Sequence, residues 1–358
     1  MFQPRMKSTL VALLAVGSLA LTACGRFAFK DAFPGDKQVK INLKGGDSSG
    51  QSLVGDESQR AGLYEVTYGV TRGINVMVVG LLALTRAIVE SPATESPDED
   101  HAVWGPSDPK GLERLQYKAT AERVAENEYL FKLLARDKNS TDEADFGEIY
   151  ALNYFHSGPE LGHGTITVDR DEHKRIDPMD TSICDTGVAV VTFANDSADE
   201  MKIVDIDFSQ LDRSGCEDKG QMGKYHYAEG PDGAGDFLFS AVGNIHEGAE
   251  AAEKPLEESL TIRAQWTSEG AGRADVIVAD GEIPGDLAAC QDASCAGLTT
   301  VTATQCWDSS FISRHETTTP EILQGMILPG VDANGDLNPV GEASACPFAF
   351  ADPAQPTS

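Results

Sequence analysis

The feature that most constrains the fold is an alternation of apolar and polar residues that begins near Leu112 and continues to Trp307. It is clear in EYLFKLLARD (128–137), GVAVVTFAN (187–195) and SLTIRAQW (259–266). Successive side chains of a strand point to opposite faces, so this period indicates half-buried β-strands. Gly, Asp, Asn and Pro separate the segments closely enough to favour consecutive antiparallel pairing. We therefore predict one antiparallel meander of about eleven strands.

A sheet of this width predicts strong curvature. Neighbouring strands twist relative to one another, so about eleven strands in one sheet do not stay flat. We expect a half-barrel or a barrel-like closure, within an α+β, mainly β fold. Four-stranded propeller blades are the alternative, although no clear internal repeat supports them. The predicted β domain covers residues 94–358.

A long helix precedes the strands. Between Glu57 and Glu90, apolar residues recur at helical spacing: Leu63, Val66, Val70, Ile74, Met77, Val78, Leu81, Leu82 and Ile88. Ser91 and Pro92 supply a stop, so we predict a helix over residues 59–93 that covers the concave face of the sheet. Residues 59–358 are expected to form one folded unit.

This helix is expected to pack on the sheet rather than to cross a membrane. Arg72 and Arg86 flank its apolar stretch, and Asn75 and Gly80 interrupt it. The uninterrupted part is shorter than the ~20 residues that a bilayer requires.

The N-terminus has the composition of an export signal. Arg5 and Lys7 precede an apolar run at 10–21 that is too short for a membrane span of ~20 residues. The run ends in LTAC at 21–24, which resembles the lipobox of bacterial lipoprotein precursors. The resemblance implies a diacylglyceryl group on the Cys24 thiol, cleavage before Cys24 and acylation, typically with palmitate, of the new amino group. The alternative is an ordinary secreted protein in which Cys24 is incidental.

Two further resemblances bear on location. Gly25 follows the cysteine where Asp would be a retention signal for the inner membrane, so the lipoprotein class implies the outer membrane, at its periplasmic face or at the cell surface. WGP, GRADV and QCWD, between Trp104 and His315, resemble exported β-rich lipoproteins of myxobacterial type. This second resemblance implies no activity.

The charge balance excludes one class of partner. Residues 1–23 hold two basic and no acidic residues, so the remaining chain has 26 Lys and Arg against 57 Asp and Glu, a net charge of −31. Such an acidic chain is not expected to bind nucleic acid. Residues 25–46 differ, with a net charge of +3. We predict a lipidated tether at 24–58, whose basic part either contacts anionic head groups or is a solvated spacer.

Six further cysteines agree with export: Cys184, Cys216, Cys290, Cys295, Cys306 and Cys346. An even number in an oxidising compartment favours three disulfides over metal ligands, although fifteen pairings are possible. Cys184 and Cys216 lie at the open ends of a hairpin predicted from 187–195 and 200–211, so we expect them to pair. The other four are expected to staple the C-terminal part.

The nominal catalytic motifs lack context, and we predict no catalytic residue. Ser48 lies in GDSSG, but no helix follows at once and no histidine precedes it. His156, His163 and His173 straddle a turn and a strand, which does not direct three ligands to one point. Asp308, Ser309 and His315 also occur close together, but nothing in the sequence gives them the geometry of a triad. A hydrolase is therefore only an outside alternative.

One weak metal motif is present. Asp332, Asn334, Asp336 and Asn338 alternate around Gly335, resembling the first half of a calcium loop. Leu337 stands where the loop requires Gly, and Ala343 stands where it requires a bidentate acid. Calcium is thus the one candidate cofactor, and an ordinary polar turn is the alternative.

These observations favour a membrane-anchored envelope lipoprotein that is a non-catalytic structural or interaction protein, with an envelope protein or a lipid as partner. The alternative is a module that binds a lipid or another apolar ligand between helix and sheet, an architecture that resembles half-barrel lipoprotein carriers. Its cavity would be lined by Met77, Val78, Leu81 and Leu82. A filled interior would argue against this alternative.

Overall fold

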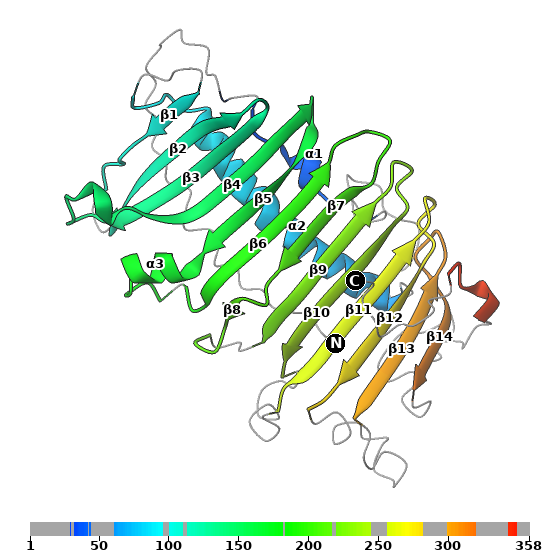
Figure 1. The fold of residues 1–358 in the computed structure, drawn as a ribbon. Coiled ribbons are helices and arrows are strands. Elements are labelled where there is room, and N and C mark those ends of the chain that lie inside the picture. Colours follow the sequence, from blue (N-terminus) through cyan, green and yellow to red (C-terminus); the bar gives the residue numbers. More distant parts are fainter. Residues whose placement is uncertain are drawn as a thin grey trace.

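One wide antiparallel sheet forms most of the protein in the computed structural model (Figure 1). The structure describes residues 29, 32–41, 43, 61–95, 100–109, 113–181, 183–216, 220–244, 256–281, 299–319 and 343–348. Its fourteen strands are β1 (His101–Trp104), β2 (Leu115–Ala125), β3 (Glu128–Asp137), β4 (Gly147–Gly158), β5 (Leu161–Asp169), β6 (Thr186–Asn195), β7 (Lys202–Asp207), β8 (Leu211–Asp212), β9 (Gln221–Glu229), β10 (Gly235–Gly243), β11 (Glu258–Trp266), β12 (Gly272–Ala279), β13 (Thr300–Trp307) and β14 (Ser313–Thr319).

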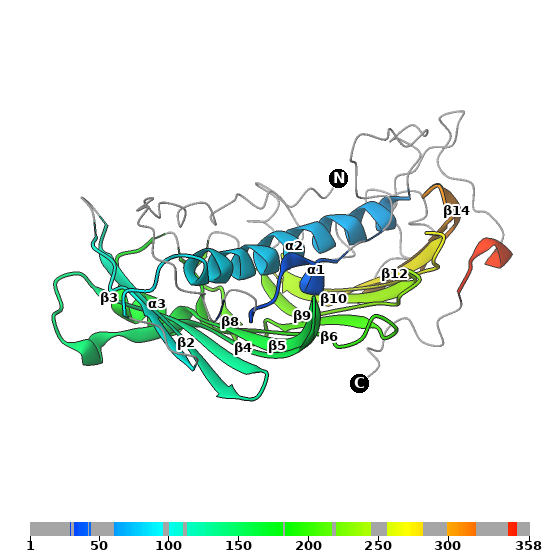
Figure 2. The ribbon, with the colours of Figure 1, turned by 90° about the horizontal axis from the view of Figure 1, so that it is seen from above.

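The strand order confirms the predicted meander. Each strand pairs with its neighbour in sequence, except that β7 pairs with β9 while the two-residue β8 pairs with β6. In the described part of the chain β1 and β14 are the open edges, so the sheet is a half-barrel and not a closed barrel. Figure 2 shows its curved profile, with the long helix α2 lying along the concave side.

Three described α-helices accompany the sheet: α1 (Asp36–Val39), α2 (Gly62–Val89) and α3 (Arg170–Ile176). Two 3₁₀ turns, Glu143–Asp145 and Ala343–Ala345, complete the elements. α2 confirms the predicted helix and crosses the strands from the β13 end to the β4 end of the sheet (Figure 1). Its buried positions recur every three or four residues: Leu63, Thr67, Thr71, Ile74, Val78, Leu82, Thr85 and Val89.

The concave face contains the core. One side of the alternation turns inward on successive strands and is almost completely buried, as in Phe131, Leu152, Ile166, Phe193, Val204, Tyr225, Phe237, Ile262 and Ala274. These side chains form one apolar cluster together with α2. The period-two pattern therefore supplies one face of a single core.

The segment predicted as a tether contributes to this core. Phe29, Phe33, Val39, Ile41 and Leu43 are all buried in the apolar cluster. The Phe29 ring lies 6.2 Å from the Tyr129 ring, and the Phe33 ring lies 5.9 Å from the Phe131 ring. Aromatic burial of this kind stabilises a fixed position, so these residues belong to the folded unit and not to a free spacer.

Candidate functional site

Several predicted positions lie outside the described residues. These are the lipidation candidate Cys24, Ser48, the cysteines Cys290 and Cys295, and the calcium candidates Asp332, Asn334, Asp336 and Asn338. Among the described residues, no group of three or more His, Cys, Asp or Glu side chains is placed to hold a metal ion.

Two disulfides involve predicted cysteines. Cys184 and Cys216 are bonded, with their Cα atoms 4.8 Å apart, which confirms the expected pair. Cys306 and Cys346 form the second bond, with Cα atoms 5.2 Å apart. The second bond attaches the segment at 343–348 to β13, and so staples the C-terminal part as expected.

Hydrogen bonds fix α2 on the concave face at both ends. At its start, the Leu63 amide donates to the Gln305 side-chain oxygen of β13 over 2.7 Å. Near its end, the hydroxyls of Thr85 and Tyr150 are 2.9 Å apart in a buried pair. Burial raises the pKa of Tyr150 far above its usual value, so its hydroxyl remains protonated. The helix therefore has a defined register on the sheet.

The middle of α2 is bonded to the N-terminal segment. The Asn75 side chain accepts from the Ile41 amide and donates to the Ile41 carbonyl, both over 2.8 Å. In the same region, Gln38 donates to the Tyr154 hydroxyl over 2.7 Å. These contacts place the N-terminal segment on the same side of the sheet as α2, as Figure 2 also shows.

The four residues predicted to line a ligand cavity divide into two pairs. Val78 and Leu82 are each 1% exposed and pack on the sheet. Met77 and Leu81 are partly buried beside the same cluster. A narrow space under the start of α2 leaves no room for a water molecule; it is lined by Leu43, Tyr64, Trp266, Gly270, Trp307 and Phe311. In the described region, aromatic side chains thus fill this part of the interface.

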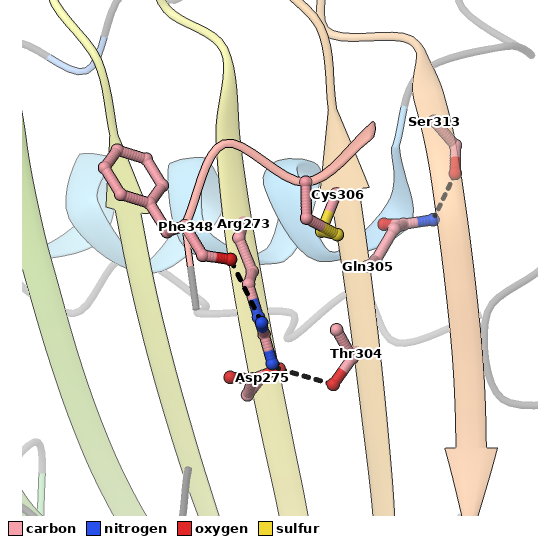
Figure 3. Close-up of a disulfide and its surroundings, with 8 residues drawn as sticks. Arg273, Asp275, Thr304, Gln305, Cys306, Ser313 and Phe348 are labelled. Carbon is pink, nitrogen blue, oxygen red and sulfur yellow. Dashed lines mark hydrogen bonds and ion pairs between the residues drawn. A yellow bond between two sulfur atoms is a disulfide. The ribbon is translucent and has the colours of Figure 1, made fainter. Parts of the chain in front are cut away.

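A larger hollow lies at the C-terminal end of the sheet, beside the Cys306–Cys346 disulfide whose surroundings Figure 3 shows. Its volume is about 480 Å³, and its lining residues are Arg273, Thr304, His315, Thr317, Ala343, Cys346, Pro347 and Phe348. Arg273 donates to the Phe348 carbonyl over 3.1 Å and to the Asp275 carboxylate over 3.1 Å. Thr304 also donates to that carboxylate. Because Arg273 and Asp275 neutralise one another, the hollow presents little net charge from this pair.

A row of polar side chains continues from Asp275 across neighbouring strands. Backbone register places Asp275 opposite Thr304 on one side and opposite Arg263 on the other. Further along the sheet, His226 Nδ1 lies 2.6 Å from Asp205 Oδ1. The hydrogen bond to Asp205 raises the pKa of His226, although burial opposes the shift. The convex face thus carries charges that pair across strands.

His156, His163 and His173 form no metal-binding group in the described structure. His163 Nδ1 lies 2.8 Å from Asp196, whose carboxylate also accepts from Ser157 over 2.6 Å. Burial raises the pKa of Asp196, but the hydrogen bonds from Ser157 and His163 together outweigh burial and hold the pKa below its usual value. The carboxylate stands between serine and histidine, whereas a catalytic triad needs the histidine in the middle. His173 instead faces Asp180, with an N–O distance of 3.8 Å.

In the other nominal triad, Asp308 makes contacts within a turn. Asp308 accepts from the amides of Ser310 and Ile312 over 2.8 and 3.2 Å and binds Arg314. His315 lines the C-terminal hollow instead. The Asp308 carboxylate thus stabilises the β13–β14 turn, which is the ordinary use of Asp in such a position.

Sequence reasoning did not find the tertiary polar contacts, namely Gln305 with Leu63, Thr85 with Tyr150, and Arg273 with Asp275. One signal was available. Thr85 is a polar residue at a position that helical spacing places on the buried side of α2, which indicates a polar partner there.

The fold and these contacts define an open antiparallel half-barrel whose concave face is covered by a hydrogen-bonded helix. Comparison with protein-family models found no match, and searches of curated proteins and of solved structures also found none.

Proposed function

We propose that the protein is a lipid-anchored, non-catalytic interaction protein of the bacterial cell envelope, attached to the outer membrane through Cys24. The observation that carries the proposal is the LTAC sequence at 21–24, at the end of an apolar run that follows Arg5 and Lys7. Several acyl chains on one residue give lasting attachment, because each buried methylene contributes about 0.8 kcal/mol.

The folded part supports an interaction role over a catalytic one. Several described carboxylates and imidazoles on the sheet are held in ion pairs or turn contacts, as in His226 with Asp205, Lys132 with Glu148 and Asp308 with Ser310. Such pairs stabilise a surface and leave no activated nucleophile among them. We therefore assign the convex face to solvent and to protein partners.

The apolar-ligand alternative receives less support. A carrier needs an apolar space of about 300 Å³ or more. Val78 and Leu82 instead pack on the sheet, and the space near Tyr64 and Trp307 does not hold even a water molecule. Native mass spectrometry of the protein after mild extraction tests this point. We expect the mass of the acylated chain alone, and a co-purifying lipid of fixed stoichiometry would favour the carrier.

Metabolic labelling tests the anchor. The full chain is produced in a Gram-negative host with an alkynyl palmitate, and the membranes are separated on a density gradient. We expect label and outer-membrane recovery for the wild type, and loss of both for Cys24→Ser. Ser48→Ala is the matched control and should behave as the wild type. An unlabelled wild-type protein would refute the proposed anchor.

A further inference from the structure

Two short rows of side chains on the convex face form the floor of the C-terminal hollow. The two rows, each running from β12 through β13 to β14, are Asp275, Thr304, Thr317 and Arg273, Cys306, His315. Residues within a row lie directly opposite one another on neighbouring strands, so their Cβ atoms are about 5 Å apart. The floor is therefore a compact set of polar groups, with one cysteine in the middle of its second row.

The segment at 343–348 forms the opposite wall of the hollow. The Cys306–Cys346 disulfide holds this segment over the floor, and Arg273 donates to the Phe348 carbonyl over 3.1 Å (Figure 3). Besides Cys346, the segment contributes Ala343, Pro347 and Phe348 to the lining. The hollow thus has a polar floor, a mainly apolar wall and a volume of about 480 Å³, which lies in the range of small-ligand sites.

The floor contains a buried charge that is not arranged for stability alone. The Asp275 carboxylate is 2% exposed. Its Oδ1 accepts from Arg273 and Thr304, but its Oδ2 accepts no hydrogen bond from the described residues. A buried carboxylate oxygen without a donor costs free energy, and folded proteins satisfy most such groups. The carboxylate does, however, fix the Arg273 guanidinium and the Thr304 hydroxyl at the floor, as groups behind a binding surface do.

The chemistry of the lining favours a neutral ligand with several hydroxyls. Asp275 neutralises Arg273, and no acidic side chain is among the lining residues that the structure describes, so neither an anion nor a cation meets an unbalanced opposite charge. An apolar ligand would cover the hydroxyls of Thr304 and Thr317 without bonding to them, which is unfavourable. The Thr304 hydroxyl donates to Asp275 and can accept from a ligand, while the exposed Thr317 hydroxyl can do both.

We propose that this hollow binds a single neutral sugar ring. The hydroxyls of the ring bond to Thr304 and Thr317, whose spacing across β13 and β14 one ring can span, and its C–H groups pack on Pro347 and Phe348. This inference goes beyond the proposed function and does not depend on the anchor at Cys24.

Saturation-transfer NMR on the full chain, in a detergent without a sugar head group, tests the proposal. The probes are glucose, galactose, mannose and N-acetylglucosamine, each measured alone. We expect saturation to pass from the protein to the protons of at least one of these sugars. No transfer to any of them overturns the proposal.

Two variants of the covering segment locate the bound sugar. Ala343→Trp adds an indole at the wall of the hollow and should abolish the transfer by occupying the space. Ala345→Trp is the matched control, because Ala345 is exposed on the same 3₁₀ turn but does not line the hollow. Both alanines are exposed, so thermal unfolding should stay unchanged in both variants.

A third variant tests the floor. Thr317→Val removes one hydroxyl at nearly constant volume and should weaken sugar binding about two- to tenfold, the effect of one neutral hydrogen bond. Wild-type affinity in both Ala343→Trp and Thr317→Val would place the sugar elsewhere and overturn the proposal.

Inorganic phosphate distinguishes a neutral site from an anion site. We expect sugar binding to be the same with and without phosphate and to be insensitive to salt, because no unbalanced charge contributes. Displacement of the sugar by phosphate would show that the hollow takes anions, and would overturn the assignment of a neutral ligand.

Discussion

The two faces of the sheet are built from the same strands but use opposite chemistry. On β3, Phe131 turns to the concave face, is fully buried and contacts the Phe33 and Tyr150 rings at 5.9 Å each. Its neighbour Lys132 turns to the convex face and pairs with Glu148 over 2.9 Å. Apolar burial stabilises a fold far more than an exposed ion pair does. We infer that packing on the concave face supplies most of the stability, and that substitutions of exposed residues on the convex face change the free energy of unfolding little.

The largest expected effect is on the concave face. Phe131→Ala should lower the free energy of unfolding by about 3–5 kcal/mol, because it removes a buried ring and leaves a cavity under its aromatic neighbours. Denaturant unfolding of the protein with its disulfides intact, followed by tryptophan fluorescence, measures the change.

Lys132→Ala is the matched control one residue away. Lys132 and Glu148 are 36% and 42% exposed, so their ion pair is screened and its loss should cost about 0–1 kcal/mol. Equal losses of unfolding free energy in Phe131→Ala and Lys132→Ala would contradict the inference that the concave face supplies most of the stability.

The second largest expected effect concerns the segment at 343–348, which the Cys306–Cys346 disulfide attaches to β13. Cys306 and Cys346 close a loop with a sequence separation of 40. Replacing both by Ala should lower the free energy of unfolding by about 2–4 kcal/mol, since the unfolded chain gains conformational freedom. Hydrogen exchange should also become faster at 343–348, where Arg273 holds Phe348.

The other disulfide provides the comparison for that result. Replacing Cys184 and Cys216 by Ala removes a bond with a sequence separation of 32 at a distant part of the sheet. Its stability loss should be similar, but exchange at 343–348 should stay slow. Fast exchange there in both double variants would mean that the disulfide near Arg273 does not hold the segment locally.

The sheet was largely predictable because its strands alternate strongly. About eleven strands were expected, and the structure has fourteen. β1 has only four residues, β8 has two, and β14 reads SRHETTT, which has no apolar alternation. These three are strands because a paired neighbour offers them backbone hydrogen bonds, which a local pattern does not reveal. The polar helix α3, RDEHKRI, was missed because Ile176 is its only buried residue, so it has no apolar periodicity.

The polar contacts were less predictable. Cys184 and Cys216 were paired correctly because a hairpin brings its own ends together. Asn75 appeared only as an interruption of an apolar helix, whereas it binds the backbone of Ile41. That contact depends on how the N-terminal segment returns over α2, and a side chain alone does not specify its partner across such a distance in sequence.

The smallest expected effect is a pH dependence on the convex face. The hydrogen bond to Asp205 raises the folded-state pKa of His226 above its unfolded value of about 6.5. The pair therefore stabilises the fold fully below that unfolded value, and the contribution is lost as the pH rises through the higher folded value. Asp236, 3.8 Å from His226 Nε2, acts in the same direction.

His226 and Asp205 are 36% and 49% exposed, so solvent screening limits the contribution to below about 1 kcal/mol. The measurement is the difference in unfolding free energy between the wild type and Asp205→Asn, followed from acidic to alkaline pH. This difference should shrink as the pH rises through the His226 titration, because neutral His226 no longer attracts the carboxylate. In a His226→Gln background the Asp205→Asn difference should not change across that range. A constant difference in the wild-type background would show that the ion pair adds nothing to the convex face, and would make the contrast with the concave face even larger.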